Sequence, residues 1–299
     1  MTGAELLNPV INGLIEGAVI ALPALALTLV MAIARFPQAA TGDLLTLGAY
    51  VAVGVQAVSI GLGWESTWWN LTGATVAAGL ACALVSVLSY EWIFKRLSRS
   101  AMVASLLASI GLAFLVRSLI TLVVGHDQRN FNIPLMRAWN FDGIRVLPTD
   151  LGLAAVALVT LIGVFAWLHL GRSGRLLRAI ADNPDLARMS GIRSRALMWR
   201  LWALAGLLAG VGGVLLGVKS VVMPELGWEL LLPAFAAMIL GGIGSPGGAV
   251  AGALLMGVGQ ELSIAWVGPS YKIAVSFLVL FVVLMVRPAG LFGRVAQVR

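Results

Sequence analysis

Long stretches without a charged residue limit what this chain can fold into. Five segments contain no Asp, Glu, Lys or Arg: Leu44–Trp64, Ser66–Tyr90, Leu151–Leu170, Leu201–Val218 and Leu231–Gln260. A helix needs about 20 apolar residues to cross the hydrocarbon core of a bilayer. Backbone groups in lipid must be satisfied within their own segment, which favours helices over open sheets. The sequence therefore predicts an all-α polytopic membrane protein, and 60% hydrophobic with 11% charged residues exclude an ordinary soluble domain.

The apolar pattern predicts a single transmembrane domain over residues 1–299 with about eight or nine spans. The expected spans cover residues 10–33, 42–63, 70–92, 101–124, 150–170, 200–218, 230–243, 248–267 and 272–288. Glycines recur four residues apart, a spacing that lets helices pack closely. The pairs are Gly13/Gly17, Gly206/Gly210, Gly213/Gly217 and Gly248/Gly252.

Residues 231–260 are too many for one straight span. Thirty residues would form a helix about 45 Å long, against a hydrocarbon core about 30 Å thick. The run is interrupted by Gly241-Gly242-Ile243-Gly244-Ser245-Pro246-Gly247-Gly248, which disfavours a continuous helix. We expect either two short spans joined by a tight turn or a re-entrant break. A break at membrane depth is tolerated only against protein or water, so Gly241, Gly242 and Gly244 are candidates for a translocation pathway.

The distribution of basic residues predicts the orientation. The charged residues that give the net charge of +7 flank the spans, as expected for a membrane protein. We therefore expect no nucleic-acid partner. The positive-inside rule places Arg35, Lys95–Arg99, residues 171–200 and the C-terminal arginines (Arg287, Arg294 and Arg299) on the cytoplasmic side. The N-terminus is then external and the C-terminus cytoplasmic. The first apolar stretch lacks a basic leader, so we expect it to remain as a span.

Motifs for catalysis or cofactor binding are not recognisable. The chain has no Gly-x-x-x-x-Gly-Lys-Ser/Thr sequence, so it cannot hydrolyse ATP through a P-loop of its own. His126 and His169 are isolated and Cys82 is the single cysteine, which predicts no metal site and no disulfide within the chain. We expect no cofactor and no enzymatic activity.

Ionisable residues within predicted spans are candidates for function. Glu16 lies either on the pathway or at the outer interface. Asp43 follows Gly42 at the start of a span, so these two residues either line the pathway or begin the helix. Arg117 is expected to extend its side chain to the outer surface.

The segment 171–200 contains seven of the 20 Lys and Arg residues. Asn183-Pro184 is a helix-start signal and Asp185 suits the positive end of a helix. The predicted helix runs from Pro184 to about Ser190 and ends at Gly191. Leu186 and Met189 share one face, which allows either docking into a partner's groove or an ordinary loop anchored to lipid.

Several motifs of this chain resemble permease subunits of the branched-chain amino-acid ABC importers. The cytoplasmic loop has the order Gly-Arg, Arg-Ala, Asp-Asn, Ala, Gly-Ile, and it precedes a glycine-rich span and the Gly-Gly-Ile-Gly-Ser motif. The matching segments are 171–192, Gly206–Gly217, Gly241–Gly252 and Tyr271–Gly293, with a weaker match over Gly42–Tyr50. Family members commonly carry an Asn-Phe-Ala-His-Gly-like sequence where this chain has Pro37–Gly42, so the resemblance implies the architecture and leaves the substrate open.

The resemblance implies a permease powered by other subunits. Two cytoplasmic ABC ATPase subunits would contact the loop 171–200, a second permease would complete the pathway, and an extracytoplasmic solute-binding protein would deliver substrate. The implied coupling residues are Asp182, Asn183, Leu186, Ala187, Met189, Gly191 and Ile192. The segment His126–Thr149 would either receive the binding protein or be an ordinary external loop. The expected location is the bacterial inner membrane, in contact with lipid.

The expected substrate is a branched-chain or other amino acid, or a small polar solute such as an amide or urea. Two other classes of function stay open at this point. One is a stand-alone secondary transporter with ion coupling through Glu16 or Asp43, and the other is an intramembrane enzyme.

Overall fold

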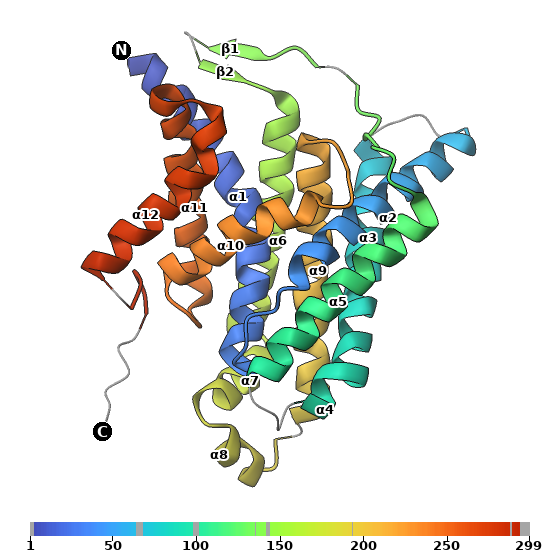
Figure 1. Ribbon diagram of the computed structural model, residues 1–299, viewed down its shortest axis with the longest axis vertical. Coiled ribbons are helices and arrows are strands. Elements are labelled where there is room, and N and C mark those ends of the chain that lie inside the picture. Colours follow the sequence, from blue (N-terminus) through green and yellow to red (C-terminus); the bar gives the residue numbers. More distant parts are fainter. Residues whose placement is uncertain are drawn as a thin grey trace.

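Helices make up nearly all of the structure, a computed structural model that describes residues 3–63, 68–97, 102–134, 136–141, 144–192, 194–287 and 289–293 (Figure 1). The helices are α1 (Gly3–Ala34), α2 (Thr41–Gly61), α3 (Trp68–Ser89), α4 (Lys95–Leu97), α5 (Met102–Val124), α6 (Pro148–Leu170), α7 (Arg172–Asp182), α8 (Pro184–Met189), α9 (Ser194–Lys219), α10 (Leu226–Gly241), α11 (Pro246–Val267) and α12 (Lys272–Val286). A π-helical turn covers Tyr90–Phe94 and a 3₁₀ turn covers Pro269–Tyr271.

Two strands, β1 (Trp139–Phe141) and β2 (Ile144–Val146), pair antiparallel with Trp139 opposite Val146. They lie at one end of the molecule, and α7 and α8 lie at the other end (Figure 1). We call these the β end and the α8 end. Of the helices in the described residues, eight are long and apolar enough to cross a membrane. The prediction of an all-α polytopic membrane protein is confirmed.

The predicted span 230–243 corresponds to α10, which is not among these eight helices. Its 16 residues rise about 24 Å, less than the hydrocarbon core of about 30 Å. A tight turn follows, in which Gly242 and Gly244 have φ of 103° and 84°, angles that favour glycine. The Ser245 side chain accepts a hydrogen bond from the Gly248 amide and begins α11. Residues 231–260 therefore form two helices joined by a tight turn, and the first helix is too short to cross the bilayer.

The C-terminal part of the described chain closes the far end of α10. The amides of Leu291 and Phe292 donate hydrogen bonds to the carbonyl oxygens of Leu240 and Gly241. These carbonyls belong to the last turn of α10, where a helix has no partners of its own. The turn after α10 and the segment Leu291–Gly293 therefore pack together at the C-terminal end of α10.

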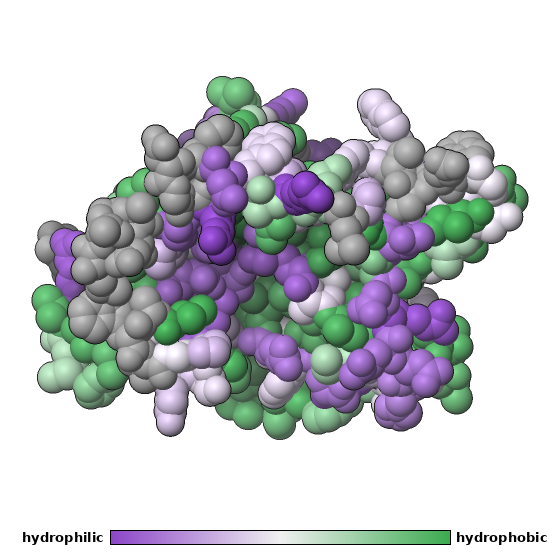
Figure 2. Space-filling view, turned by 90° about the horizontal axis from the view of Figure 1, so that it is seen from above, coloured by the Kyte–Doolittle hydropathy of each residue, from purple (hydrophilic) through white to green (hydrophobic). Residues whose placement is uncertain are grey.

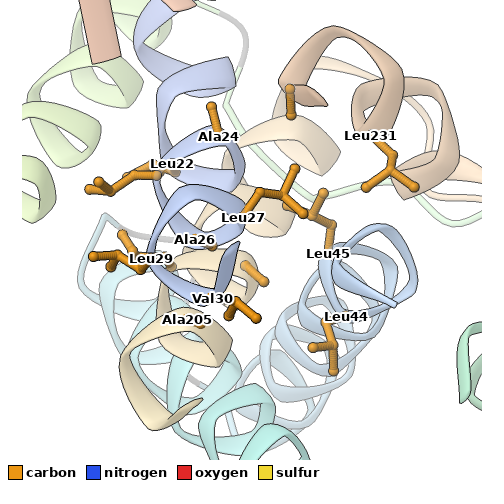
Figure 3. Packing of buried hydrophobic residues seen from close by; sticks show 14 of the residues in the cluster. Leu22, Ala24, Ala26, Leu27, Leu29, Val30, Leu44, Leu45, Ala205 and Leu231 are labelled. Atoms are coloured by element: carbon orange, nitrogen blue, oxygen red, sulfur yellow. The ribbon is translucent and has the colours of Figure 1, made fainter. Parts of the chain in front are cut away.

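The core is built around α1. Leu22, Leu25 and Leu27 are fully buried, and Figure 3 shows α1 side chains packed beside Leu44 and Leu45 of α2. Glycines allow the surrounding helices to approach. A side chain on Gly257 would collide with the α1 backbone, and the glycine pairs singled out in the sequence lie mainly at such crossings, so their predicted packing role is confirmed.

Two helices begin inside the bundle, α2 and α10. The segment between α1 and α2 turns back from the α8 end, and its Ala39 amide donates a hydrogen bond to Ser109 Oγ of α5 (3.2 Å). The first turns of α2 and α10 touch, because Gly42 and Gly227 are in contact and the Gly227 amide donates to Thr46 Oγ1 (2.9 Å). Non-helical backbone at membrane depth must be satisfied by protein or water, and these two hydroxyls serve that purpose.

Candidate functional site

The helix α8 has the boundaries that the sequence predicts. Asn183 is its N-cap, and its side-chain oxygen accepts hydrogen bonds from the amides of Asp185 and Leu186. The chain leaves the helix at Gly191, where φ is +76°, and the Ile192 amide donates to the Ala187 carbonyl. This pattern is a glycine C-cap.

The predicted coupling residues divide into two groups. Ala187 is buried and Ile192 packs against the core, so these two attach α8 to the bundle. Leu186 is 61% exposed and Met189 is 87% exposed, and Asp182 is exposed beside them. The short helix therefore presents two apolar side chains to the outside at the α8 end of the molecule (Figure 1).

The preceding helix α7 was not distinguished from a loop in the sequence. Its buried residues, Ser173, Gly174, Leu177 and Ile180, follow helical spacing, a signal that could have revealed it. Its arginines bind carbonyls at the end of α6, with Arg178 donating to the Leu168 oxygen (2.9 Å). α7 is therefore attached to the end of α6 and packs against α8.

A second contact attaches the start of α9 to the π-helical turn Tyr90–Phe94 that follows α3. Glu91 accepts hydrogen bonds from Arg195 (2.7 Å) and from the Trp199 indole (2.9 Å), and it pairs with Lys95. Sequence reasoning did not identify this cluster, because its members lie about a hundred positions apart. It connects the segment that follows α8 to the transmembrane bundle.

Glu16 takes part in a network of charges toward the β end. Its two carboxylate oxygens pair with Lys219 (2.6 Å) and Lys272 (3.3 Å), and Lys272 also pairs with Glu261 (2.9 Å). The network joins α1, α9, α11 and α12. Its location agrees with the interpretation of Glu16 as an interface residue, and a role on the pathway stays a prediction.

Arg117 does not extend to the outer surface as expected. Its Nε donates to Asp43 Oδ1 (2.8 Å), and Asp43 is almost completely buried. Its guanidinium also lies 5.5 Å from the centre of the Trp228 ring of α10. The expectation was wrong because the first turn of α2 lies inside the bundle, where Asp43 offers Arg117 an anionic partner.

The remaining pathway candidates have structural roles in the contacts described above. Gly42 touches Gly227, Gly241 touches Gly248, and Gly242 packs against Gly293. Whether any of these glycines lines a pathway stays a prediction. The described residues contain no group of three His, Cys, Asp or Glu that could hold a metal ion. Arg99, Arg294 and Arg299, used for the orientation, lie outside the described residues.

The described chain is a bundle of long apolar helices with ion pairs inside it and a short exposed helix at one end, which defines a polytopic membrane protein. The chain belongs to the family described as the branched-chain amino acid transport system permease component, which matches residues 10–284. It is therefore a permease subunit of the ABC transporter type, as the sequence motifs predicted.

Curated relatives agree over nearly the full length. The chain is 30% identical to the high-affinity branched-chain amino acid transport system permease protein LivH of Escherichia coli K12, with 96% of each chain covered. It is 27% identical to the corresponding protein BraD of Pseudomonas aeruginosa, again with 96% of each covered. It is also 27% identical to the autoinducer 2 import system permease protein LsrD of Klebsiella pneumoniae, over 80% of this chain and 74% of that one.

Proposed function

We propose that this chain forms the translocation pathway of an importer for branched-chain or other amino acids and is powered by separate ATPase subunits. The relatives that match over 96% of this chain carry branched-chain amino acid transport in their names, whereas LsrD is named for autoinducer 2. The substrate therefore varies among similar permeases. Pro37–Gly42 differs from the common family sequence at the start of α2, where the first turn contacts α10, so substrate choice is a property to measure directly.

The observation that carries the proposal is the geometry of α8. Leu186 and Met189 are exposed on a helix that is capped at both ends and supported by α7. A short amphipathic helix with apolar residues three positions apart fits a groove on a partner. We infer that α8 docks in a cleft of the ATPase and transmits its closure to the bundle, which then switches between inward-facing and outward-facing states.

The other partners follow from this assignment. The α8 end would face the cytoplasm and the β end the outside, and the segment 126–149 would then lie on the side where an extracytoplasmic binding protein docks. A second permease, identical or related, would complete the pathway. The proposed location is the bacterial inner membrane, with the N-terminus external and the C-terminus cytoplasmic.

Co-purification with the ATPase tests the role of α8. Replacing Leu186 and Met189 by Asp is expected to reduce the amount of ATPase bound to the detergent-solubilised permease at least about tenfold, because two apolar anchors become charged. Ala179→Asp, an equally drastic change at an exposed position of α7, is the matched control and should retain the ATPase. Full ATPase binding by the double variant would contradict the proposal.

A further inference from the structure

One face of α10 carries charges that cannot lie against lipid. Glu225 at its N-cap and Trp228, Glu229 and Leu232 in the helix follow helical spacing, and all four are exposed. We call these residues the α10 stripe. The opposite face is buried against the bundle, and in the described residues neither glutamate has an ion-pair partner. Carboxylates within a bilayer face protein or a water-filled cavity, so the stripe faces one of these.

Arg117 adds a cation to the same place. It is held by Asp43 of α2, and its guanidinium lies over the rings of Phe114 (5.8 Å) and Trp228 (5.5 Å). The bond to Asp43 uses Nε, and among the described residues no partner takes the two terminal nitrogens. A guanidinium has five N–H groups arranged to bind a carboxylate through two parallel bonds. Arg117 therefore has donors left for a ligand.

Two buried polar atoms point to the same region. Asp43 Oδ2 and the Tyr50 hydroxyl have no hydrogen-bond partner within the described residues, although both side chains are more than nine-tenths buried. Both lie on α2, at helical spacing, and the first turn of this helix touches the first turn of α10. Buried polar groups without a partner are costly, which favours a site that a polar ligand or water completes.

The arrangement matches the charges of an amino acid. We propose that Arg117, Glu225 and Glu229 form a binding site for a zwitterionic amino acid on the translocation pathway. The α-carboxylate binds the free guanidinium nitrogens of Arg117, and the α-ammonium binds the glutamates. Trp228 and Leu232 contact the aliphatic side chain, and Asp43 positions Arg117. The site rests on the proposed function and adds the residues that select the substrate.

A second permease subunit could also cover a polar face, but two observations favour a ligand. The stripe and Arg117 together place both signs of charge beside the apolar side chains of Trp228 and Leu232, as small-molecule sites do. Its unpaired carboxylates would also be costly to bury in a protein interface. Hydrophilic side chains gather in the middle of the β end, with hydrophobic residues around much of its edge (Figure 2), which fits an aqueous approach from that side.

Chemical labelling tests whether water reaches the stripe. A cysteine at position 232 (Leu232→Cys) in the assembled transporter should react with a charged, water-soluble methanethiosulfonate reagent, and 10 mM leucine, on the order of a saturating dose, should slow the reaction. The native Cys82 is buried, so it does not compete. Val159→Cys, on an exposed face of α6, is the control for lipid exposure and should stay unlabelled. An unreactive cysteine at 232, or its cross-linking to the second permease, would overturn the proposal.

Transport measurements test whether Arg117 and Glu229 bind the substrate. In proteoliposomes containing the assembled transporter and its binding protein, Arg117→Gln should lower ATP-driven leucine uptake at least about tenfold, the loss expected for a charge-assisted hydrogen bond. ATPase stimulation by the liganded binding protein should persist, which a folding defect would abolish. Arg117→Lys keeps the positive charge but loses the paired N–H donors of the guanidinium, so its uptake rate should lie between those of the unmodified transporter and Arg117→Gln.

Glu229→Gln should also lower uptake, whereas Asp150→Asn at the start of α6 should not. Normal uptake by Arg117→Gln would overturn the site and leave the proposed function intact. Absence of ATP-driven leucine uptake by the unmodified transporter would overturn both.

Discussion

At the scale of single residues, Gly213 has no room for any larger side chain. A Cβ there would collide with the Leu45 carbonyl oxygen of α2. Close approach of backbones is what small residues provide in membrane helices, since lipid offers little hydrophobic drive for association. Gly213 therefore sets the distance between α2, which carries Asp43, and α9, which follows α8 in the chain.

Gly213→Ala is expected to destabilise the protein by about 1–3 kcal/mol, because the added methyl group forces α2 and α9 apart. Gly163→Ala is the matched control, since a Cβ at Gly163 in α6 meets no atom within 4 Å. That change should be neutral or stabilise by about 0.5–1 kcal/mol through helix propensity. Thermal unfolding in detergent measures both. Equal stabilities of the two variants would contradict the assigned contact.

At the scale of elements, the network around Glu16 connects four helices that are far apart in the sequence. Lys219 ends α9 and Lys272 begins α12, while Glu261 lies on α11. The charges are partly shielded from solvent, with Glu16 at 16% exposure. Loss of Glu16 would leave two lysines without their shared anion.

Glu16→Gln is therefore expected to lower the free energy of unfolding by about 1–3 kcal/mol. Glu261→Gln should cost less, because Lys272 keeps Glu16 as a partner. The test compares thermal unfolding with the uptake rate per folded transporter. If Glu16 is structural, unfolding shifts and the rate per folded molecule does not. A rate that falls while unfolding is unchanged would instead assign Glu16 to the pathway.

The sequence predicted those elements that depend on local chemistry. The helix α8 was predicted because its cap residues, Asn183, Pro184 and Gly191, are adjacent to it in the chain. The helix α7 was missed although its buried positions follow helical spacing. Its arginines make the segment resemble a charged loop, so the helical period of its apolar residues was not used. The turn between α10 and α11 was located and the span before it was expected to be short, but the start of α10 at Leu226 was not predicted.

The contacts of the candidate site were harder to predict because they join distant positions. Arg117 and Asp43 are 74 positions apart, and their pairing requires that α2 begin inside the bundle. The return of residues 35–40 into the bundle is stabilised by Ser109 on α5. No local sequence pattern predicts this contact. The α10 stripe was visible as spacing, but its exposure depends on which face of α10 packs against the bundle.

At the scale of the whole molecule, the two proposed functional regions are separate from each other. The helix α8, proposed to couple to the ATPase, lies at one end, and the site proposed around Arg117 lies inside the bundle, at the first turns of α2 and α10. Between them run α1 and α9, the two most deeply buried spans. In the proposed mechanism, a movement of α8 would reach the site through these closely packed helices, which switch between discrete arrangements rather than deform.

The most direct measurement of the central claim is leucine uptake into proteoliposomes under two sources of energy. The account predicts uptake when this permease is assembled with its ATPase and binding protein and ATP is supplied. It also predicts that uptake stops when the ATPase is made inactive, and that the permease alone does not concentrate leucine under a proton or sodium gradient. Gradient-driven accumulation by this chain alone would contradict the account and establish a secondary transporter instead.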